Sequence, residues 1–381
     1  MVTEKQVLSA LEGVVDPELG GNVVELGMIS RVTVSADSAV EVGLALTVAQ
    51  CPMRNHLETE TRRKVAALPG VTKVEVVTTA MTKRQRAELM SVARLRARQT
   101  AEPTQVHPTT RVIAVGSGKG GVGKSTVSVN LAVALSRSGK RVGLLDADIW
   151  GFSIPRMLGL DERLQADSDT KLIVPTVADG VKVVSTGLII ESEGTALMWR
   201  GLMLSKALEQ FLTQVDWGEL DYLVIDLPPG TGDVQMALSR LLPQAELIVV
   251  TTPQRVAQKV AVRLADMARR SFMPIVGVVE NMSDFTCEHG TSYALFGSGG
   301  GAELAEELAV PLIGQIPIDP AIVRAGDEGV PPPDHEAAGT VFRDVAARVM
   351  ELVPPVEDES CTGRIAKLLE ALDTRQLAVG S

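Results

Sequence analysis

The sequence predicts a doubly wound α/β domain with a mostly parallel sheet, preceded by a small α+β domain. From residue 111 onward, short apolar runs alternate with segments of helical periodicity, which is typical of parallel strands joined by crossover helices. The earlier part instead has two alternating runs around a short turn, which predicts a hairpin, with helical segments on either side. A chain of 381 residues is also long enough to form two cores.

Changes of composition along the chain predict where the domains begin and end. A basic segment of helical pattern, 81–98, runs into a polar stretch with two prolines and no periodicity, which is typical of a linker. We therefore expect a small α+β domain at 1–82, a basic helix and linker at 83–110, the α/β domain at 111–352, and an acidic tail with a short amphipathic helix at 353–381.

Apolar periodicity predicts the elements of each domain. In the small domain we expect helices at 3–13 and from after Cys51-Pro52 to 68, and strands at 29–35, 40–46 and 71–77. In the larger domain we expect strands at 112–115, 142–145, 181–185, 222–225, 247–251, 274–279 and 312–316. Because ligands of such a sheet bind at the carboxyl ends of its strands, the polar residues that follow these runs are the candidates for function.

A glycine-rich turn follows the first strand of the larger domain and leads into a helical segment at 127–138. The run from Gly118 fits G-x-x-x-x-G-K-[ST], a loop whose backbone N–H groups surround phosphate oxygens. Lys124 is expected to neutralise the outer phosphates, and the Ser125 hydroxyl to complete a magnesium shell. The sequence therefore predicts a nucleotide-binding loop formed by Gly118, Lys119, Gly120, Gly121, Val122, Gly123, Lys124, Ser125 and Thr126.

Acidic residues follow the second and fourth strands of the same domain. Asp146 and Asp148 come after the second strand, and Asp226 ends the fourth, YLVID. A carboxylate at the end of an apolar strand beside a phosphate loop is the usual group that holds magnesium through water. Asp146 and Asp226 are therefore candidate ligands of Mg²⁺, and 228–233 is a candidate switch loop that senses the γ-phosphate.

Composition excludes some functions. A net charge of −10 and a pI near 5.1 disfavour a general nucleic-acid binder, which needs clustered Lys and Arg. The N-terminal segment is charged rather than signal-like, and no apolar run is long enough to span a bilayer, so we expect a cytoplasmic protein. Cys51, Cys287 and Cys361 are odd in number and widely spaced, which favours free thiols or metal ligands over disulfides.

The form GKGGVGKST resembles the deviant phosphate loop of dimerising ATPases related to nitrogenase iron protein and to the cell-division and plasmid-partition ATPases. The resemblance implies that two copies enclose ATP and that Lys119 of one copy stabilises charge in the other copy's site, as an arginine finger does. A solvated loop lysine is the alternative. The same resemblance implies that Asp148 orients the attacking water with support from Asp146. The expected catalytic residues are therefore Lys119, Lys124, Asp148 and Asp226.

Further motifs resemble the Mrp/ApbC-type iron-sulfur cluster carrier ATPases, namely DADIWGFS, VIDLPPGTGD, VENMS, FGSGGG and IPIDP. The resemblance implies a P-loop ATPase that uses ATP and Mg²⁺, works as a homodimer, and transfers clusters, of the 4Fe-4S type, to apo iron-sulfur proteins. It implies that Asn281 contacts adenine, which an amide suits because it offers a donor and an acceptor. A turn role for Asn281 is the alternative. No nucleic acid and no stable membrane association are expected.

The first domain resembles the small domain of iron-sulfur assembly factors, which is also fused ahead of some Mrp/ApbC-type ATPases. The matching residues are Asp16-Pro17-Glu18, Glu25-Leu26-Gly27 and the turn from Thr47 to Cys51-Pro52. The resemblance makes Cys51 a candidate cluster-handling thiol and metal ligand, with a buried structural cysteine as the alternative. For Asp16 and Glu18, turn and capping roles are favoured over metal binding.

One part of the carrier pattern is missing. Carriers of this family hold a C-x-x-C pair before the glycine-rich turn, whereas here that stretch holds Cys287 and His289 without a second cysteine. Either these two residues supply a thiolate and an imidazole from each copy, since mixed ligation occurs in iron-sulfur centres, or the metal site is lost. A metal-free ATPase scaffold and a positioning ATPase therefore stay open; the latter would use the C-terminal apolar stripe of Ile365, Leu368, Leu369 and Leu372.

Overall fold

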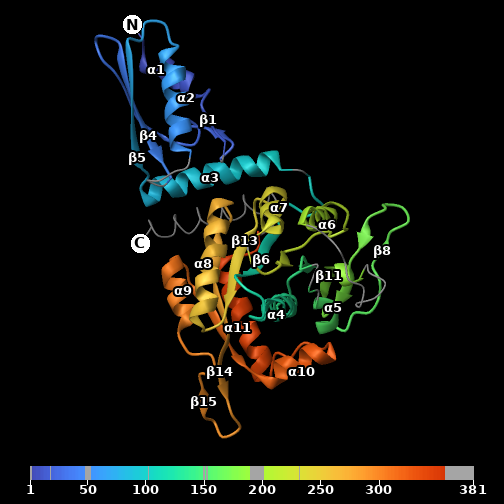
Figure 1. Ribbon diagram of the computed structural model, residues 1–381. Helices are drawn as coiled ribbons and strands as arrows, with labels where there is room; N and C mark the ends of the chain where they lie inside the picture. The colour runs from blue at the N-terminus through green and yellow to red at the C-terminus, as the bar shows by residue number, and fades with distance from the viewer. Residues whose placement is uncertain are drawn as a thin grey trace, which may run out of the picture. The chain divides into compact units, whose positions relative to one another are not determined.

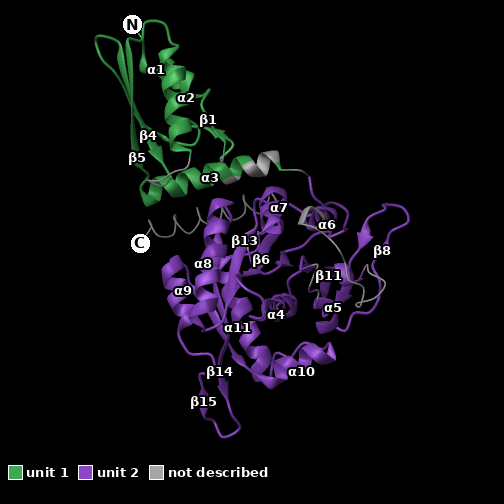
Figure 2. Cartoon of the chain, in the orientation of Figure 1, with its two compact units in different colours: residues 1–101 green, residues 102–381 purple. Residues whose placement is uncertain are grey.

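The computed structural model divides the chain into two compact units, residues 1–101 and 102–381 (Figure 2). The residues that the structure describes are 2–17, 19–47, 53–101, 103–148, 151, 153–188, 201–230 and 232–356. The predictions for Glu18, Cys51, Cys361 and the C-terminal apolar stripe lie outside these ranges.

The first unit is a small α+β domain, as the sequence predicts (Figure 1). Its three-stranded sheet has the order β3-β4-β5, in which β3 and β4 form the expected antiparallel hairpin and β5 pairs in parallel with β4. The buried side chains of its first two helices include Val7 and Leu11 in the first and Leu57 and Val65 in the second. The elements are α1 (Glu4–Leu11), β1 (Val15–Asp16), β2 (Gly21–Asn22), β3 (Ile29–Val34), β4 (Ala39–Leu46), α2 (Arg54–Ala66), β5 (Lys73–Ala80) and α3 (Lys83–Thr100).

The basic segment after this sheet is one continuous helix, α3. Its start is set by a capping box, in which the Thr82 hydroxyl accepts from the Gln85 backbone N–H at 3.3 Å and the Gln85 side chain accepts from the Thr82 N–H at 3.0 Å. Two N–H groups that the helix cannot satisfy internally are thereby paired. The division between the units falls after this helix, at residue 101.

The second unit contains one large sheet covered by helices (Figure 1). Among the helices that the structure describes, none has the length and apolar character needed to cross a bilayer. The elements are β6 (Arg111–Ser117), α4 (Lys124–Arg137), β7 (Val142–Asp146), α5 (Ile154–Met157), β8 (Gln165–Ala166), β9 (Ile173–Val174), β10 (Thr176–Ala178), β11 (Val181–Ser185), η1 (Thr186–Leu188), α6 (Gly201–Thr213), β12 (Tyr222–Asp226), α7 (Asp233–Leu241), β13 (Glu246–Thr251), α8 (Arg255–Arg270), β14 (Ile275–Thr286), β15 (Ser292–Tyr293), α9 (Gly300–Leu308), β16 (Leu312–Ile318), α10 (Pro320–Glu328) and α11 (Ala337–Leu352).

The sheet has the order β10-β11-β7-β12-β6-β13-β14-β15, and β16 also pairs with β14. Each predicted apolar run forms one of its strands, and the ladders among these strands are all parallel. The short strands β10 and β15 pair antiparallel to their neighbours. Since β6 lies between β12 and β13, the glycine-rich turn that follows it emerges near the middle of the sheet's carboxyl edge.

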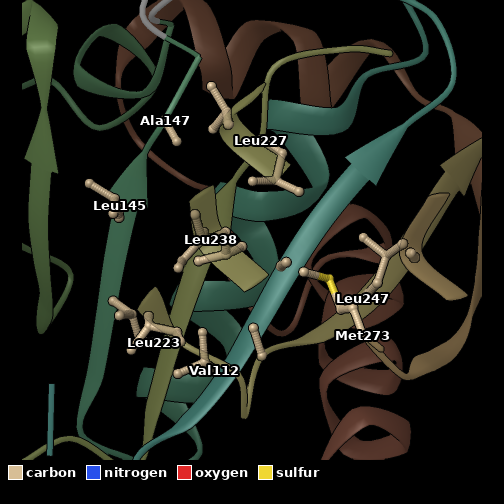
Figure 3. Close-up of a cluster of buried hydrophobic side chains, with 14 of the residues drawn as sticks. Val112, Leu145, Ala147, Leu223, Leu227, Leu238, Leu247 and Met273 are labelled. Carbon is tan, nitrogen blue, oxygen red and sulfur yellow. The ribbon is translucent and has the colours of Figure 1, made fainter. Parts of the chain in front are cut away.

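Helices cover both faces of this sheet, which confirms the doubly wound fold. Alternate residues of β6 point to opposite faces, so Val112 and Ala114 join a core formed with α6, α7, α8 and α9 (Figure 3). Ile113 and Val115 join a second core, formed with α4 and α11. Strands buried on both faces read as continuous apolar runs, which is why the sequence pattern found them.

β14 is longer than the predicted strand at 274–279, since it continues to Thr286 and turns into β15. Apolar periodicity stops at Val279 because the next two residues, Glu280 and Asn281, are buried polar residues and those from Met282 onward are partly or fully exposed. The extension is held instead by backbone pairing, of Phe285 with Ile318 of β16 and with Tyr293 of β15. This hairpin carries Cys287 at its turn.

Candidate nucleotide-binding site

The phosphate loop links the end of β6 to α4 and requires glycine at several positions. Gly121 and Gly123 have φ values of +78° and +77°, which side chains rarely adopt. A methyl group on Gly118 would lie 2.4 Å from the carbonyl carbon of Val260 in α8, so the loop needs glycine there to pack against that helix. Around Gly120, in contrast, no atom of the described residues lies within 4 Å of an added methyl.

Lys124 is buried at the start of α4 and faces carboxylates from two strands. Its Nζ lies 2.8 Å from Oδ2 of Asp226, which ends β12, and 3.8 Å from Oδ2 of Asp148, which follows β7. Asp226 is fully buried and also accepts the hydroxyls of Ser125 and Ser128, each at 2.6 Å. The predicted lysine, serine and carboxylates therefore come together at the carboxyl edge of the sheet.

Asp146 is buried behind this cluster, at the end of β7. Its carboxylate accepts the Ser185 hydroxyl at 2.9 Å and the Asp148 backbone N–H at 3.1 Å. Burial, and then the negative charge of Asp226, raise the pKa of Asp146 above its usual range. The raised pKa favours the neutral, protonated form of Asp146, and a cation bound beside it would favour the charged carboxylate instead.

Lys119, predicted to act in a partner copy, contacts its own chain in this structure. Its Nζ donates to Oε1 of Gln254 at 3.2 Å, and its backbone carbonyl accepts the Ser117 hydroxyl at 3.0 Å. Gln254 follows β13, at the same edge of the sheet as the loop. Gln254 belongs to none of the sequence motifs, and its position after a strand is the signal that could have identified it.

Asn281 lies against the phosphate loop. Its side-chain Nδ2 donates to the Val122 carbonyl at 2.9 Å, and the asparagine is almost wholly buried. The neighbouring Glu280, which the sequence reasoning missed, accepts the N–H of Gly301 at the start of α9 and the side chain of Gln315 at 2.6 Å. The Asn281 bond holds β14 beside the phosphate loop, and the Glu280 bonds hold the start of α9 and β16 against β14.

The cysteine-bearing hairpin stands apart from these carboxylates in sequence and is open to solvent. The Cys287 N–H donates to the Thr291 carbonyl at 3.0 Å, which closes the turn, and the side chain of His289 is 83% exposed. Hydrogen bonding from the backbone of His289, and then of Thr291, lowers the pKa of the Cys287 thiol. Within the described part of the chain, no three His, Cys, Asp or Glu side chains converge on a preformed metal site.

In the first unit the structure agrees with a turn role for Asp16. Its Oδ1 accepts the backbone N–H of Leu19 at 3.1 Å. The buried Asp16 therefore stabilises the turn that follows β1, as an aspartate before proline commonly does.

The comparisons with known proteins agree with this fold and site. Residues 108–350 match the sequence model of the ParA family, described as NUBPL iron-transfer P-loop NTPase, and residues 4–76 match that of an iron-sulfur cluster assembly protein. An iron-sulfur cluster carrier protein from Mycobacterium leprae is 46% identical over 333 residues, covering 85% of this chain and 86% of the relative. Another, from Synechocystis, is 44% identical over 336 residues, covering 87% and 91%.

A solved structure is also similar: the nucleotide-binding protein from Archaeoglobus fulgidus in complex with ADP shares 39% sequence identity. It covers 57% of this chain and 86% of that chain, with a TM-score of 0.51. The fold and the site thus define a P-loop nucleotide-binding NTPase with a mostly parallel sheet. The chain belongs to the NUBPL-type iron-transfer P-loop NTPases of the ParA family, with an iron-sulfur cluster assembly domain before the NTPase. This confirms the family expected from the motifs.

Proposed function

We propose that the chain is an ATP-hydrolysing iron-sulfur cluster carrier that works as a homodimer and transfers clusters to apo-proteins. The observation that carries the proposal is the buried contact of Lys124 with Asp226 directly behind a glycine-rich phosphate loop. The family, and relatives named iron-sulfur cluster carriers, support the cargo.

In the proposed reaction, the loop N–H groups bind the phosphates and Lys124 neutralises their outer oxygens. Asp148 orients a water for attack on the γ-phosphorus; the bond to the bridging oxygen breaks, giving ADP and phosphate. Asp148 suits this role because its side chain is 14% exposed at the edge of the buried cluster, whereas that of Asp226 is fully buried. Asn281 contributes by fixing the loop and is the candidate contact for adenine.

Magnesium fits the residues of this site. Ser125 and Asp226, with Asp146 behind them, offer only oxygen ligands, which Mg²⁺ prefers. Mg²⁺ commonly takes one or two protein groups and completes its shell with phosphates and water, so a preformed cage is not required. When bound, Mg²⁺ offsets charge that develops on the phosphate oxygens.

The proposed homodimer gives Lys119 its function. In one copy Lys119 makes a single hydrogen bond to the neutral side chain of Gln254. That bond pairs a charged donor with a neutral acceptor, whereas a bond to a phosphate pairs two opposite charges. Exchange of Gln254 for the phosphates of a nucleotide in the second copy is therefore favourable, and ATP stabilises the dimer.

Cys287 is the candidate ligand for the cluster, of the 4Fe-4S type, as cargo. Two copies supply two thiolates, with His289 as the nearest further ligand along each hairpin. The lowered pKa of Cys287 favours the thiolate, which is the form that binds iron. Cys51 of the small domain is the second candidate thiol. The single cysteine of the exposed hairpin also favours a second function, that of a metal-free ATPase scaffold.

Anaerobic reconstitution with iron and sulfide tests the cargo, by absorption spectrum and iron count on wild type, Cys287→Ala and Cys51→Ala. Iron that is lost with Cys287→Ala assigns the cluster to the hairpin, and iron that is lost only with Cys51→Ala assigns it to the small domain. Absence of stable iron in the wild type contradicts the carrier function and leaves the scaffold. ATP turnover with Mg²⁺, followed as phosphate release, tests the ATPase separately.

A further inference from the structure

A buried glutamine holds the loop that follows Asp226. Gln235 lies in the first turn of α7 and is only 2% exposed. Its Nε2 donates to the carbonyls of Pro228 at 3.2 Å and Gly230 at 3.0 Å, and its Oε1 accepts the Gly232 N–H at 2.9 Å. One side chain thus binds three backbone groups along the candidate switch loop.

Only an amide side chain can make this set of bonds. Both hydrogens of Nε2 and one lone pair of Oε1 are used, so a carboxylate of the same shape would lack the donors and an apolar side chain would lack all three. Burial of an amide is unfavourable unless its hydrogen bonds are made. Gln235 is therefore specified by the loop rather than by the core of α7, where Val234 and Leu238 pack.

The loop held by Gln235 is also tied to the strand that carries the phosphate loop. The Leu227 N–H donates to the Val115 carbonyl at 3.0 Å, and the Gly230 N–H donates to the Ser117 carbonyl at 2.8 Å. The segment starts immediately after Asp226 and passes beside the end of β6. A shift of this segment therefore changes the backbone next to both the phosphate loop and Asp226.

We propose that Gln235 is a positioning residue for ATP hydrolysis, which holds Pro228, Gly230 and Gly232 of the candidate switch loop in the conformation that responds to the γ-phosphate. The inference rests on the proposed ATPase function. Gln235 acts through the backbone of the loop and contacts no nucleotide itself. Because the loop is held before the nucleotide arrives, it does not have to be reorganised during the reaction, which is the basis of electrostatic preorganisation.

Two substitutions of similar size test the inference. Gln235→Met keeps the volume and removes all three bonds, and Gln235→Glu keeps the acceptor but sets a carboxylate oxygen against two carbonyls. Ser239→Ala is the matched control, since the Ser239 hydroxyl bonds only within α7, to the Gln235 carbonyl at 2.9 Å. Steady-state ATP hydrolysis gives kcat and KM for each variant, and titration gives the dissociation constants of ADP and of a nonhydrolysable ATP analogue.

We expect kcat to fall by about tenfold or more in both Gln235 variants, because loss of positioning alone has effects of that size. The preference for the ATP analogue over ADP is expected to disappear in both, and Ser239→Ala is expected to match wild type. A purely structural role would lower the melting temperature of the variants and leave kcat per folded molecule and the preference unchanged, which would overturn the inference. Because the preference is measured without turnover, it decides the role of Gln235 even where the wild type hydrolyses no ATP.

Discussion

Two glycine-to-alanine substitutions in the phosphate loop separate the packing of the loop from its binding of phosphate. At Gly118 the added methyl group would lie 2.4 Å from the Val260 carbonyl carbon and 2.5 Å from the Ala261 nitrogen, whereas ordinary contacts begin at 3.4 Å. The backbone of α8 or the loop must therefore move by about an ångström to accept it. At Gly120 no such contact exists, and its φ is not in the left-handed region.

The expected cost follows from this geometry. Forcing an extra methyl group into a packed interior costs about 1–3 kcal/mol. For a domain of about this size, each kcal/mol lowers the melting temperature by about 2–4 °C, so Gly118→Ala is expected to lower it by about 2–12 °C. Gly120→Ala is expected to leave the melting temperature unchanged or slightly raised, because alanine has less conformational freedom than glycine in the unfolded chain.

Thermal unfolding without nucleotide, followed by titration with ATP, measures both effects. We expect Gly120→Ala to bind ATP at least about tenfold more weakly despite normal stability, because any side chain obstructs the approach of backbone N–H groups to phosphate. A Gly118→Ala melting temperature equal to that of wild type would refute the packing of the loop on α8. Unchanged ATP affinity in Gly120→Ala would refute its place in the phosphate cradle.

Three further predictions concern single side chains. Lys124→Ala should abolish ATP binding, because it removes the one ammonium that faces Asp226 in the described structure. A wild-type ATP affinity of this variant in calorimetric titration would contradict the prediction. Lys119→Ala should bind ATP normally but hydrolyse it slowly, and full turnover would exclude the role in the second copy. Asn281→Ala should lower the free energy of unfolding by about 1–3 kcal/mol, since it leaves the Val122 carbonyl unpaired; equal stability in denaturant unfolding would show that the loop holds its shape without the amide.

Much of the fold could be predicted because its strands are buried on both faces. Runs such as Val112–Val115 are apolar throughout, and the glycines and Asp226 follow the strands at the expected edge. The extension of β14 beyond Val279 could not be predicted in this way. It depends on pairing with β16 and β15, which are distant in sequence, and backbone pairing leaves little trace in side-chain pattern.

Some residues of the candidate site could likewise be predicted from the sequence, and others could not. The phosphate loop, Lys124 and the carboxylates are local motifs, and a parallel sheet brings the carboxyl ends of its strands together, so their proximity could be predicted. The side chains that hold the loops became visible in the folded structure. Gln235 holds the loop after Asp226, Asn281 holds the phosphate loop, and Gln254 accepts from the side chain of Lys119. Each of these amides bonds to a carbonyl or a lysine that is distant in sequence or on another element, and such bonds satisfy buried or half-buried polar groups. The residues next to an amide in the sequence do not show which partner it will meet.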